Sequence, residues 1–228
     1  STSGHRKKIV EANSHSNIQR QIQLLRALGD PERYPHPVSA VEHRETHISH
    51  ILLAGDYAYK IKKPLDLGFL DFTSLARRKL FCEEELRLNR RLAPKLYLDC
   101  IAICGTVENP LLGGDPDQAL EYAVKMRRFP QAALLDHCWA SGVLQTRHMD
   151  NLARQLAGFH ERIARAGADQ PWGAPDIVQR PVMDNFTQTR PLLKDGEDLR
   201  MLDELQDWTL AAYARLRPAL AERKAGGF

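Results

Sequence analysis

Residues 55–64 read GDYAYKIKKP, a stretch that alternates aromatic or aliphatic residues with small or basic ones and stops at a proline. Such alternation predicts a strand, because successive side chains of a strand point to opposite faces of a sheet. Gly55-Asp56 stands where a tight hairpin would turn, and the apolar run ISHILLA leads into it. We therefore expect consecutive antiparallel strands over residues 41–46, 47–53 and 57–62.

Outward from this hairpin, the pattern changes to helical and then returns to strands. Thr73 or Ser74 can cap a helix that ends at Pro94. Two further strand-like runs, 96–104 and 120–129, flank the turn-rich segment 109–117, and helical spacing predicts an earlier helix over 18–28. The expected apolar positions of the helix before Pro94 are Leu80, Phe81, Leu88 and Leu92. The chain is thus expected to form an α+β fold, with an antiparallel sheet of about five strands and one helix inserted after the third.

Beyond Pro130 the composition is helical. Residues 148–167 and 199–224 form long amphipathic patterns, separated by a stretch with Pro, Gly and Asn over 171–196. We therefore divide the chain into an N-terminal helix and connector over 1–37, a strand-rich lobe over 38–130 and a helical lobe over 131–228.

Composition sets limits on the partners. With 228 residues, 43% of them hydrophobic, the chain can bury a sizeable core, while a net charge of +3 gives weak support for a nucleic-acid partner. The apolar runs are shorter than the roughly 20 residues that a membrane helix needs. The basic N-terminal region contains no apolar signal segment. We expect a cytoplasmic protein that binds neither nucleic acid nor membrane.

One lysine of the opening stretch is in position for phosphate chemistry. A lysine on the third strand of a hairpin sheet, followed by a helix with a glutamate, is how protein-kinase-like enzymes hold ATP. In their signature an alanine two residues earlier shares the lysine's face and lies under the adenine. Ala58 and Lys60 fit this spacing. Choosing Lys62 would place bulky Lys60 under the adenine, and Lys63 would point to the other face. We predict Lys60 as the phosphate ligand and interpret Lys62 and Lys63 as charges at the strand edge.

The glutamate partner lies within the run Glu83-Glu84-Glu85. A glutamate that points into a cleft should share the helix face that packs on the sheet, so its neighbours three, four and seven residues away should be apolar. Glu85 is our first choice because Leu88 and Leu92 follow it at such spacing. Glu84, which shares its face with arginines, is the second choice.

Residues 46–98 resemble the N-terminal lobe of the aminoglycoside phosphotransferase family. This block reads THISHILLAGDYAYKIKKPLDLGFLDFTSLARRKLFCEEELRLNRRLAPKLYL. Within it, LAPKLY also resembles a segment of choline kinases. The similarity runs from about Tyr34 to Phe129, and LARQLAGFHERI is weakly similar to the family's first long C-lobe helix. The sequence resembles in particular a bacterial branch of the family that is often fused to a P-loop kinase or ATPase domain. The resemblance implies a protein-kinase-like fold and transfer of a phosphoryl group from ATP, with Mg²⁺, to a hydroxyl of a small molecule. Lys60 and Glu85 would form the ATP clamp.

The resemblance also suggests where the rest of the nucleotide would lie. The segment YAVKMRRFP is similar to the family's last N-lobe strand and hinge, so backbone groups of Arg127, Arg128 and Phe129 would hydrogen-bond the adenine. The segment ETHIS stands where a phosphate-covering loop belongs. It has no glycine, so its backbone cannot approach phosphates freely, and the hydroxyls of Thr46 and Ser49 are the candidate donors instead.

The family's catalytic loop, similar to HGDLHxxN, and its magnesium-binding Asp should follow the last long helix. No stretch up to Phe228 matches them. We therefore expect that this chain contains no catalytic residue and that the Mg²⁺ ligands and the catalytic loop lie beyond it. We also expect the helical lobe to be incomplete, which favours self-association. The alternative is a kinase-like nucleotide-binding or regulatory module that does not catalyse and serves a fused or partner domain. The glycine-free ETHIS segment favours this alternative, and the acceptor stays unidentified.

Three histidines lie close together in the strand region. His43 and His47 would share one face of a strand and His50 would oppose them, so the pattern predicts no metal site.

Overall fold

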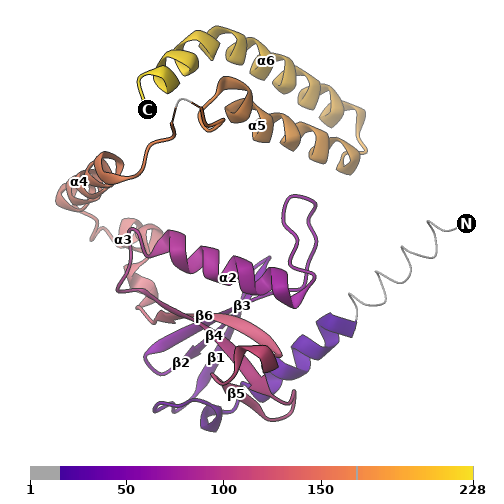
Figure 1. Ribbon diagram of the computed structural model, residues 1–228, viewed down its shortest axis with the longest axis vertical. Helices are drawn as coiled ribbons and strands as arrows, with labels where there is room; N and C mark the ends of the chain where they lie inside the picture. The colour runs from indigo at the N-terminus through magenta and orange to yellow at the C-terminus, as the bar shows by residue number, and fades with distance from the viewer. Residues whose placement is uncertain (1–15, 168, 228) are drawn as a thin grey trace, which may run out of the picture. The chain divides into compact units, whose positions relative to one another are not determined.

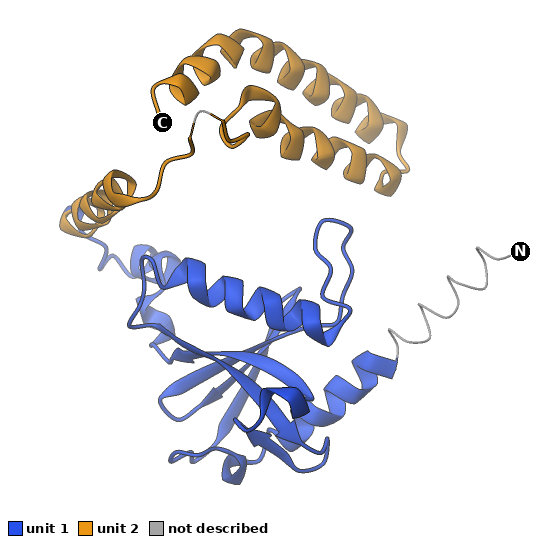
Figure 2. Cartoon of the chain, viewed as in Figure 1, with its two compact units in different colours: residues 1–146 blue, residues 147–228 orange. Residues whose placement is uncertain are grey.

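The computed structural model describes residues 16–167 and 169–227, and the chain divides into two compact units after Thr146 (Figure 2). The sequence predicted this boundary near residues 129–133. The first unit extends further and includes η3 (Gln131–Ala133) and α3 (Leu135–Ala140), which contact each other. The N-terminal helix, described over residues 16–27, is also part of the first unit.

A six-stranded antiparallel sheet, in the order β1-β2-β3-β6-β4-β5, forms the centre of the first unit (Figure 1). The predicted strands all occur: 57–62 has the predicted ends, and no end of the other four shifts by more than two residues. Segment 109–117, which was predicted as turns, contributes the additional short strand β5. The strands are β1 (Val41–Glu45), β2 (Ser49–Ala54), β3 (Tyr57–Lys62), β4 (Tyr97–Gly105), β5 (Pro110–Leu112) and β6 (Glu121–Arg127).

The β2–β3 hairpin fixes which side chains face which way. Ala54 pairs with Tyr57 across a two-residue turn, as the Gly55-Asp56 dipeptide predicted. Gly55 has a φ of 55°, and a Cβ there would lie 2.5 Å from the carbonyl oxygen of Pro37, so only glycine fits. In this register Lys60 lies opposite Ile51.

One face of the sheet packs against the N-terminal helix. Leu24 and Leu25 of that helix, and Leu28 just after it, are buried in one apolar cluster with Tyr59 and Ile61 of β3. Alternation along β3 therefore places Tyr59 in the core and leaves Ala58, Lys60 and Lys62 on the opposite face.

Helix α2 (Leu75–Asn89) contacts the opposite face, and Ser74 caps it by accepting a hydrogen bond of 3.2 Å from the backbone N–H of Arg77. Cys82 is fully buried there, in a cluster with Tyr122 and Val124 of β6. The cap and the position of this helix after the third strand confirm the prediction.

The predicted packing face of α2 was wrong at three of its four positions; the fourth, Phe81, packs edge-on against buried Phe72 with the ring centres 5.0 Å apart. Leu80, Leu88 and Leu92 are 50%, 45% and 39% exposed, whereas the buried residues of the helix are Arg78 and Cys82. Charged side chains can lie on the side of α2 that faces the sheet because they form ion pairs with residues of the strands. The apolar periodicity of α2 therefore does not mark its buried side.

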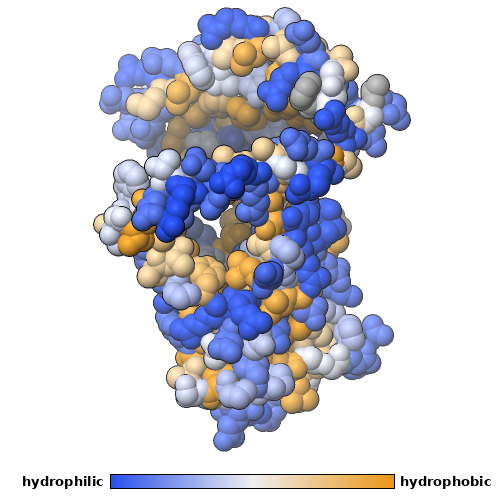
Figure 3. All heavy atoms as spheres, turned by 90° about the vertical axis from the view of Figure 1, so that its left-hand side faces the viewer, coloured by the Kyte–Doolittle hydropathy of each residue, from blue (hydrophilic) through white to orange (hydrophobic). Residues whose placement is uncertain are grey.

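The second unit consists of α4 (Thr146–Arg162, whose first residue belongs to unit 1), α5 (Pro175–Thr189) and α6 (Gly196–Ala225), with α5 and α6 in contact. Helix α5 lies in the stretch that was predicted as a connector. Its Pro175 occupies the first turn, where no N–H is required, and Pro181 is accommodated inside the helix. None of these three helices has a buried residue, and apolar side chains remain at the surface (Figure 3). The remaining 3₁₀ turns are η1 (Pro31–Arg33), η2 (Pro116–Gln118) and η4 (Arg190–Leu192).

No helix in the described part of the chain is both long and apolar enough to cross a membrane.

Candidate functional site

Lys60, predicted as the phosphate ligand, and Glu85, predicted as the glutamate that holds it, form an ion pair. Lys60 Nζ of β3 lies 2.8 Å from Glu85 Oε1 of α2. The side chain of Lys60 is 25% exposed and that of Glu85 is 14% exposed, so the pair is partly buried yet reachable from solvent. Asn89, one turn further along α2, donates a hydrogen bond of 2.8 Å to the backbone carbonyl of Glu85.

Lys62 is a third member of this cluster, so its prediction as a strand-edge charge was wrong. Its Nζ lies 2.6 Å from Glu85 Oε2, and its side chain is 5% exposed. The ammonium also lies 5.0 Å from the centre of the Phe72 ring. Strand alternation contained this information, because Lys60 and Lys62 are two residues apart and must share a face. Lys63 points elsewhere and pairs with exposed Glu45 at 2.5 Å.

The surroundings of Glu85 keep its carboxylate ionised. Burial raises the pKa of Glu85, but the hydrogen bonds and charges of Lys60 and Lys62 outweigh this effect and hold the pKa below its usual value. Burial and the nearby charge of Glu85 together raise the pKa of Tyr97 on β4, against the opposing effect of Lys60. Glu84, the second choice, instead pairs with Arg87 on the exposed side of α2, at 2.7 Å.

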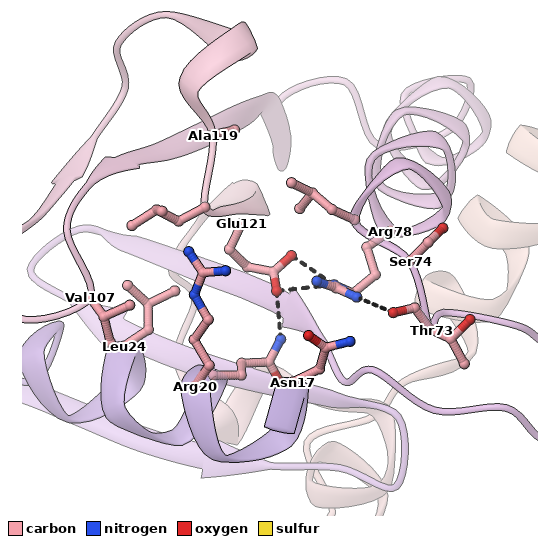
Figure 4. A pocket seen from close by; sticks show the side chains of 12 residues that line it. Asn17, Arg20, Leu24, Thr73, Ser74, Arg78, Val107, Ala119 and Glu121 are labelled. Carbon is pink, nitrogen blue, oxygen red and sulfur yellow. Dashed lines mark hydrogen bonds and ion pairs between the residues drawn. The ribbon is translucent and has the colours of Figure 1, made fainter. Parts of the chain in front are cut away.

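A second, more deeply buried ion pair ties α2 to the sheet, and the sequence analysis did not identify it. Arg78 Nε lies 2.9 Å from Glu121 Oε1 of β6, and their side chains are 8% and 3% exposed. Gln21 of the N-terminal helix donates hydrogen bonds to Glu121 Oε2 at 2.8 Å and to the carbonyl oxygen of Lys62 at 2.9 Å. Figure 4 shows Arg78 and Glu121 pointing toward each other. Both residues, together with Arg20, line a hollow of about 150 Å³.

Arg78 also donates hydrogen bonds to the carbonyl oxygens of Phe72 and Thr73. These bonds hold the segment before α2 against the helix. The available sequence signal was a glutamate at the start of an otherwise largely apolar strand, together with an arginine near the start of the preceding helix. It was missed because charged residues were expected at the surface.

The ETHIS segment forms a closed turn between β1 and β2. The backbone N–H of Thr46 donates to the carbonyl oxygen of Ser49 at 2.8 Å, and the N–H of Ser49 donates to Thr46 Oγ1 at 3.0 Å. Ser49 is fully buried and pairs with Lys62 across the strands, and its hydroxyl has no hydrogen-bond partner among the residues that the structure describes. The Thr46 hydroxyl is thus engaged within the turn.

The predicted hinge residues lie at the end of β6. The backbone N–H groups of Arg127 and Arg128 donate to the carbonyl oxygens of Leu96 and Asp56, each at 2.8 Å, so both are already engaged. Arg128 and Phe129 line a surface hollow of about 270 Å³. The hollow is also lined by Arg44, Leu53, Gly55, Asp56, Pro130 and Gln131.

This hollow opens near Ala58. Leu53, one of its lining residues, is the cross-strand partner of Ala58, and the two share a sheet face with Lys60. The arginine side chains at the hollow are paired: Arg44 and Arg128 both contact Glu42, at 2.7 and 3.4 Å.

His43 and His50 meet, which the sequence analysis excluded. Residues 46–48 form the turn rather than strand, so the alternation restarts at β2, and His43 Nε2 lies 3.1 Å from His50 Nδ1. Burial lowers the pKa of His50 to about 4, with Glu45 opposing the shift and Lys63 and His43 adding to it. Across residues 16–167 and 169–227, no group of three or more His, Cys, Asp or Glu side chains is placed to hold a metal ion.

Comparison with known proteins identifies relatives but no activity. No family model matches the chain, and no solved structure matches it. Uncharacterized proteins of Mycobacterium bovis and of two Mycobacterium tuberculosis strains are each 30% identical to it over 179 residues. The match covers 75% of this chain and 34% of each relative, so the chain spans about a third of the length of the curated relatives it matches.

Proposed function

We propose that the first unit binds ATP, as the N-terminal lobe of a kinase-like, aminoglycoside-phosphotransferase-like enzyme. The whole protein would then transfer a phosphoryl group to a hydroxyl of a small molecule. The observation that carries this proposal is the contact of 2.8 Å between Lys60 Nζ and Glu85 Oε1. A lysine held in this way by a helix glutamate presents a fixed positive charge to the phosphates of a nucleotide.

The arrangement of the elements supports the proposal. Helix α2 follows the third strand directly, and β6, which leads to Arg128 and Phe129, lies next to β3 in the sheet. In a protein kinase the lysine is likewise on the third strand and the glutamate on the helix that follows.

The hollow beside Phe129 offers a place for the adenine. Its volume of about 270 Å³ is close to the lower end of the roughly 300–1,000 Å³ typical of small-molecule sites. Because Leu53 faces the same way as Ala58 and Lys60, a nucleotide can extend from this hollow along β3 toward the lysine. Both the base and the phosphates would then contact one sheet face.

Calorimetric titration of the chain with a non-hydrolysable ATP analogue tests this proposal. The unsubstituted chain should bind the analogue, and Lys60→Ala should weaken binding at least about tenfold, because it removes the charge nearest the phosphates. Lys63→Ala is the matched control, since Lys63 pairs with Glu45 away from Glu85. Absence of binding to the unsubstituted chain, or equal binding by the Lys60→Ala variant, would refute the proposal.

A second candidate function is a nucleotide-binding or regulatory module that does not catalyse. The closed turn of Thr46 and Ser49 favours it, because the hydrogen bonds within that turn use groups that a phosphate-covering loop would present to ATP. The two candidates differ in turnover. Incubation of a full-length mycobacterial relative with radiolabelled ATP and a panel of hydroxyl-bearing small molecules should yield a labelled product only if the protein is a phosphotransferase.

A further inference from the structure

Glu85 has two lysine partners that differ in their surroundings. Lys60 Nζ contacts Oε1 at 2.8 Å and Lys62 Nζ contacts Oε2 at 2.6 Å, so each carboxylate oxygen has its own ammonium group. The Lys60 side chain is 25% exposed, whereas that of Lys62 is 5% exposed. Only Lys60 is therefore open to an incoming ligand to any useful extent.

The cluster carries an excess of one positive charge. Lysine side chains are protonated near neutral pH, and Glu85 supplies a single negative charge to two of them. In a partly buried place the effective dielectric constant is lower than in water, so this excess is poorly screened and attracts an anion. A single lysine and glutamate would instead form a neutral pair.

Lys62 is enclosed on several sides. Its ammonium lies 5.0 Å from the centre of the Phe72 ring, an arrangement that compensates part of the loss of hydration. Gln21 fixes its backbone through a hydrogen bond of 2.9 Å to the Lys62 carbonyl oxygen. These contacts hold Lys62 on Glu85 whether or not Lys60 stays there.

We propose that Lys62 is a positioning residue that holds Glu85, and with it α2, so that Lys60 can turn to a phosphate group without leaving the glutamate unpaired. This inference rests on the proposed nucleotide-binding function. In this two-lysine clamp, Lys62 supplies the permanent partner of the carboxylate and Lys60 the exchangeable one. The ligand class is a polyphosphate, and the clamp is complete before the ligand arrives.

The first test compares binding of a non-hydrolysable ATP analogue by four chains. Lys62→Met keeps an unbranched side chain that is one atom shorter but removes its charge, and we expect about tenfold weaker binding because the excess charge is lost. Lys62→Arg, which restores the charge, should recover most of the affinity. Lys63→Met is the control and should bind like the unsubstituted chain. Equal affinity of the folded Lys62→Met variant would overturn the inference.

The second test requires no substitution and uses nitrogen NMR of the lysine ammonium groups during titration with inorganic tripolyphosphate. The Lys60 resonance should shift with added tripolyphosphate while the Lys62 resonance stays in place, because Lys60 exchanges Glu85 for a phosphate group and Lys62 does not. A shift of the Lys62 resonance as large as that of Lys60 would overturn the inference. This measurement remains decisive if Lys62→Met fails to fold.

The two tests also separate this inference from the proposed function. If the ATP analogue binds and loses no affinity in Lys62→Met, nucleotide binding stands and the role of Lys62 is refuted. If the analogue does not bind but tripolyphosphate shifts Lys60 alone, the two-lysine clamp stands and nucleotide binding is refuted. If neither ligand has any effect, both are refuted.

Discussion

Glu85 links the charge of the site to the stability of the fold. Its pKa in the folded chain is below the ordinary value of 4.5, because the hydrogen bonds from Lys60 and Lys62 outweigh burial. The stability that these contacts supply is present above that ordinary value and is lost as the pH falls through the lower folded pKa. Acid should therefore weaken the attachment of α2 to β3.

Replacing Glu85 with glutamine should lower the free energy of unfolding at neutral pH and make it less sensitive to acid. Urea unfolding at about pH 7 and about pH 3 measures both effects. Glu84→Gln is the control, since Glu84 forms only the exposed pair with Arg87 and its loss should change stability little. Equal acid sensitivity of the unsubstituted chain and Glu85→Gln would contradict the prediction.

His50 gives a second pH dependence. Its folded pKa of about 4 lies below the ordinary 6.5, so the unfolded chain binds a proton first and stability falls as the pH drops from 6.5 toward 4. His50→Gln should flatten the dependence of stability on pH within this window. Exposed His47, replaced in the same way, is the matched control and should leave the slope unchanged. An unaltered slope for His50→Gln would show that another group titrates.

At the scale of the element, α2 is attached through buried Cys82 and through two sets of ion pairs with the strands. Arg78→Met should lower the free energy of unfolding by about 3–5 kcal/mol, because it leaves buried Glu121 without its partner. Arg87→Met on the opposite side of the same helix breaks an exposed pair and should cost at most about 1 kcal/mol. Chemical denaturation of both variants measures the difference, and similar losses would mean that the buried pair does not anchor the helix.

The strands and the order of the elements were predictable because local signals agree with the sheet. Gly55-Asp56 specifies a tight turn, alternation in 57–62 specifies a strand, and Ser74 specifies the start of α2. The same alternation places Lys60 on the sheet face that meets Glu85, and it applies equally to Lys62. These features depend on the near neighbours of each residue, which a single sequence contains.

The buried face of α2 was not predictable from hydrophobic periodicity. Its inward stripe contains Arg78, Cys82 and Glu85, while Leu80 and Leu88 lie outward. Charged residues can be buried only where partners from distant strands meet them, and Glu121 is 43 residues away from Arg78 in the chain. Such pairs form through tertiary contacts, so helical spacing alone could not reveal them. The burial of Lys62 beneath Phe72 has the same origin.

At the scale of the whole molecule, the two units differ in how well they bury apolar residues. The first unit has two clusters of buried side chains around its sheet. Helices α4, α5 and α6 have no buried residue, and Met201, Leu205 and Trp208 of α6 are 57%, 52% and 66% exposed. Because burial of apolar surface is the main source of stability, the second unit should open more readily than the first.

Hydrogen exchange of a dilute, monomeric sample should therefore be slow in β3 and β6 and much faster in α5 and α6. Exchange rates in the central strands should follow global unfolding, whereas those in the helices should follow local opening. Raising the protein concentration is the control for self-association. If a second copy covers the apolar side chains of α6, including Trp208, protection there should rise with concentration while protection of β3 stays the same. Equal protection of α6 and β6 in a sample that light scattering shows to be monomeric would contradict the prediction, because it would require a buried core in the second unit.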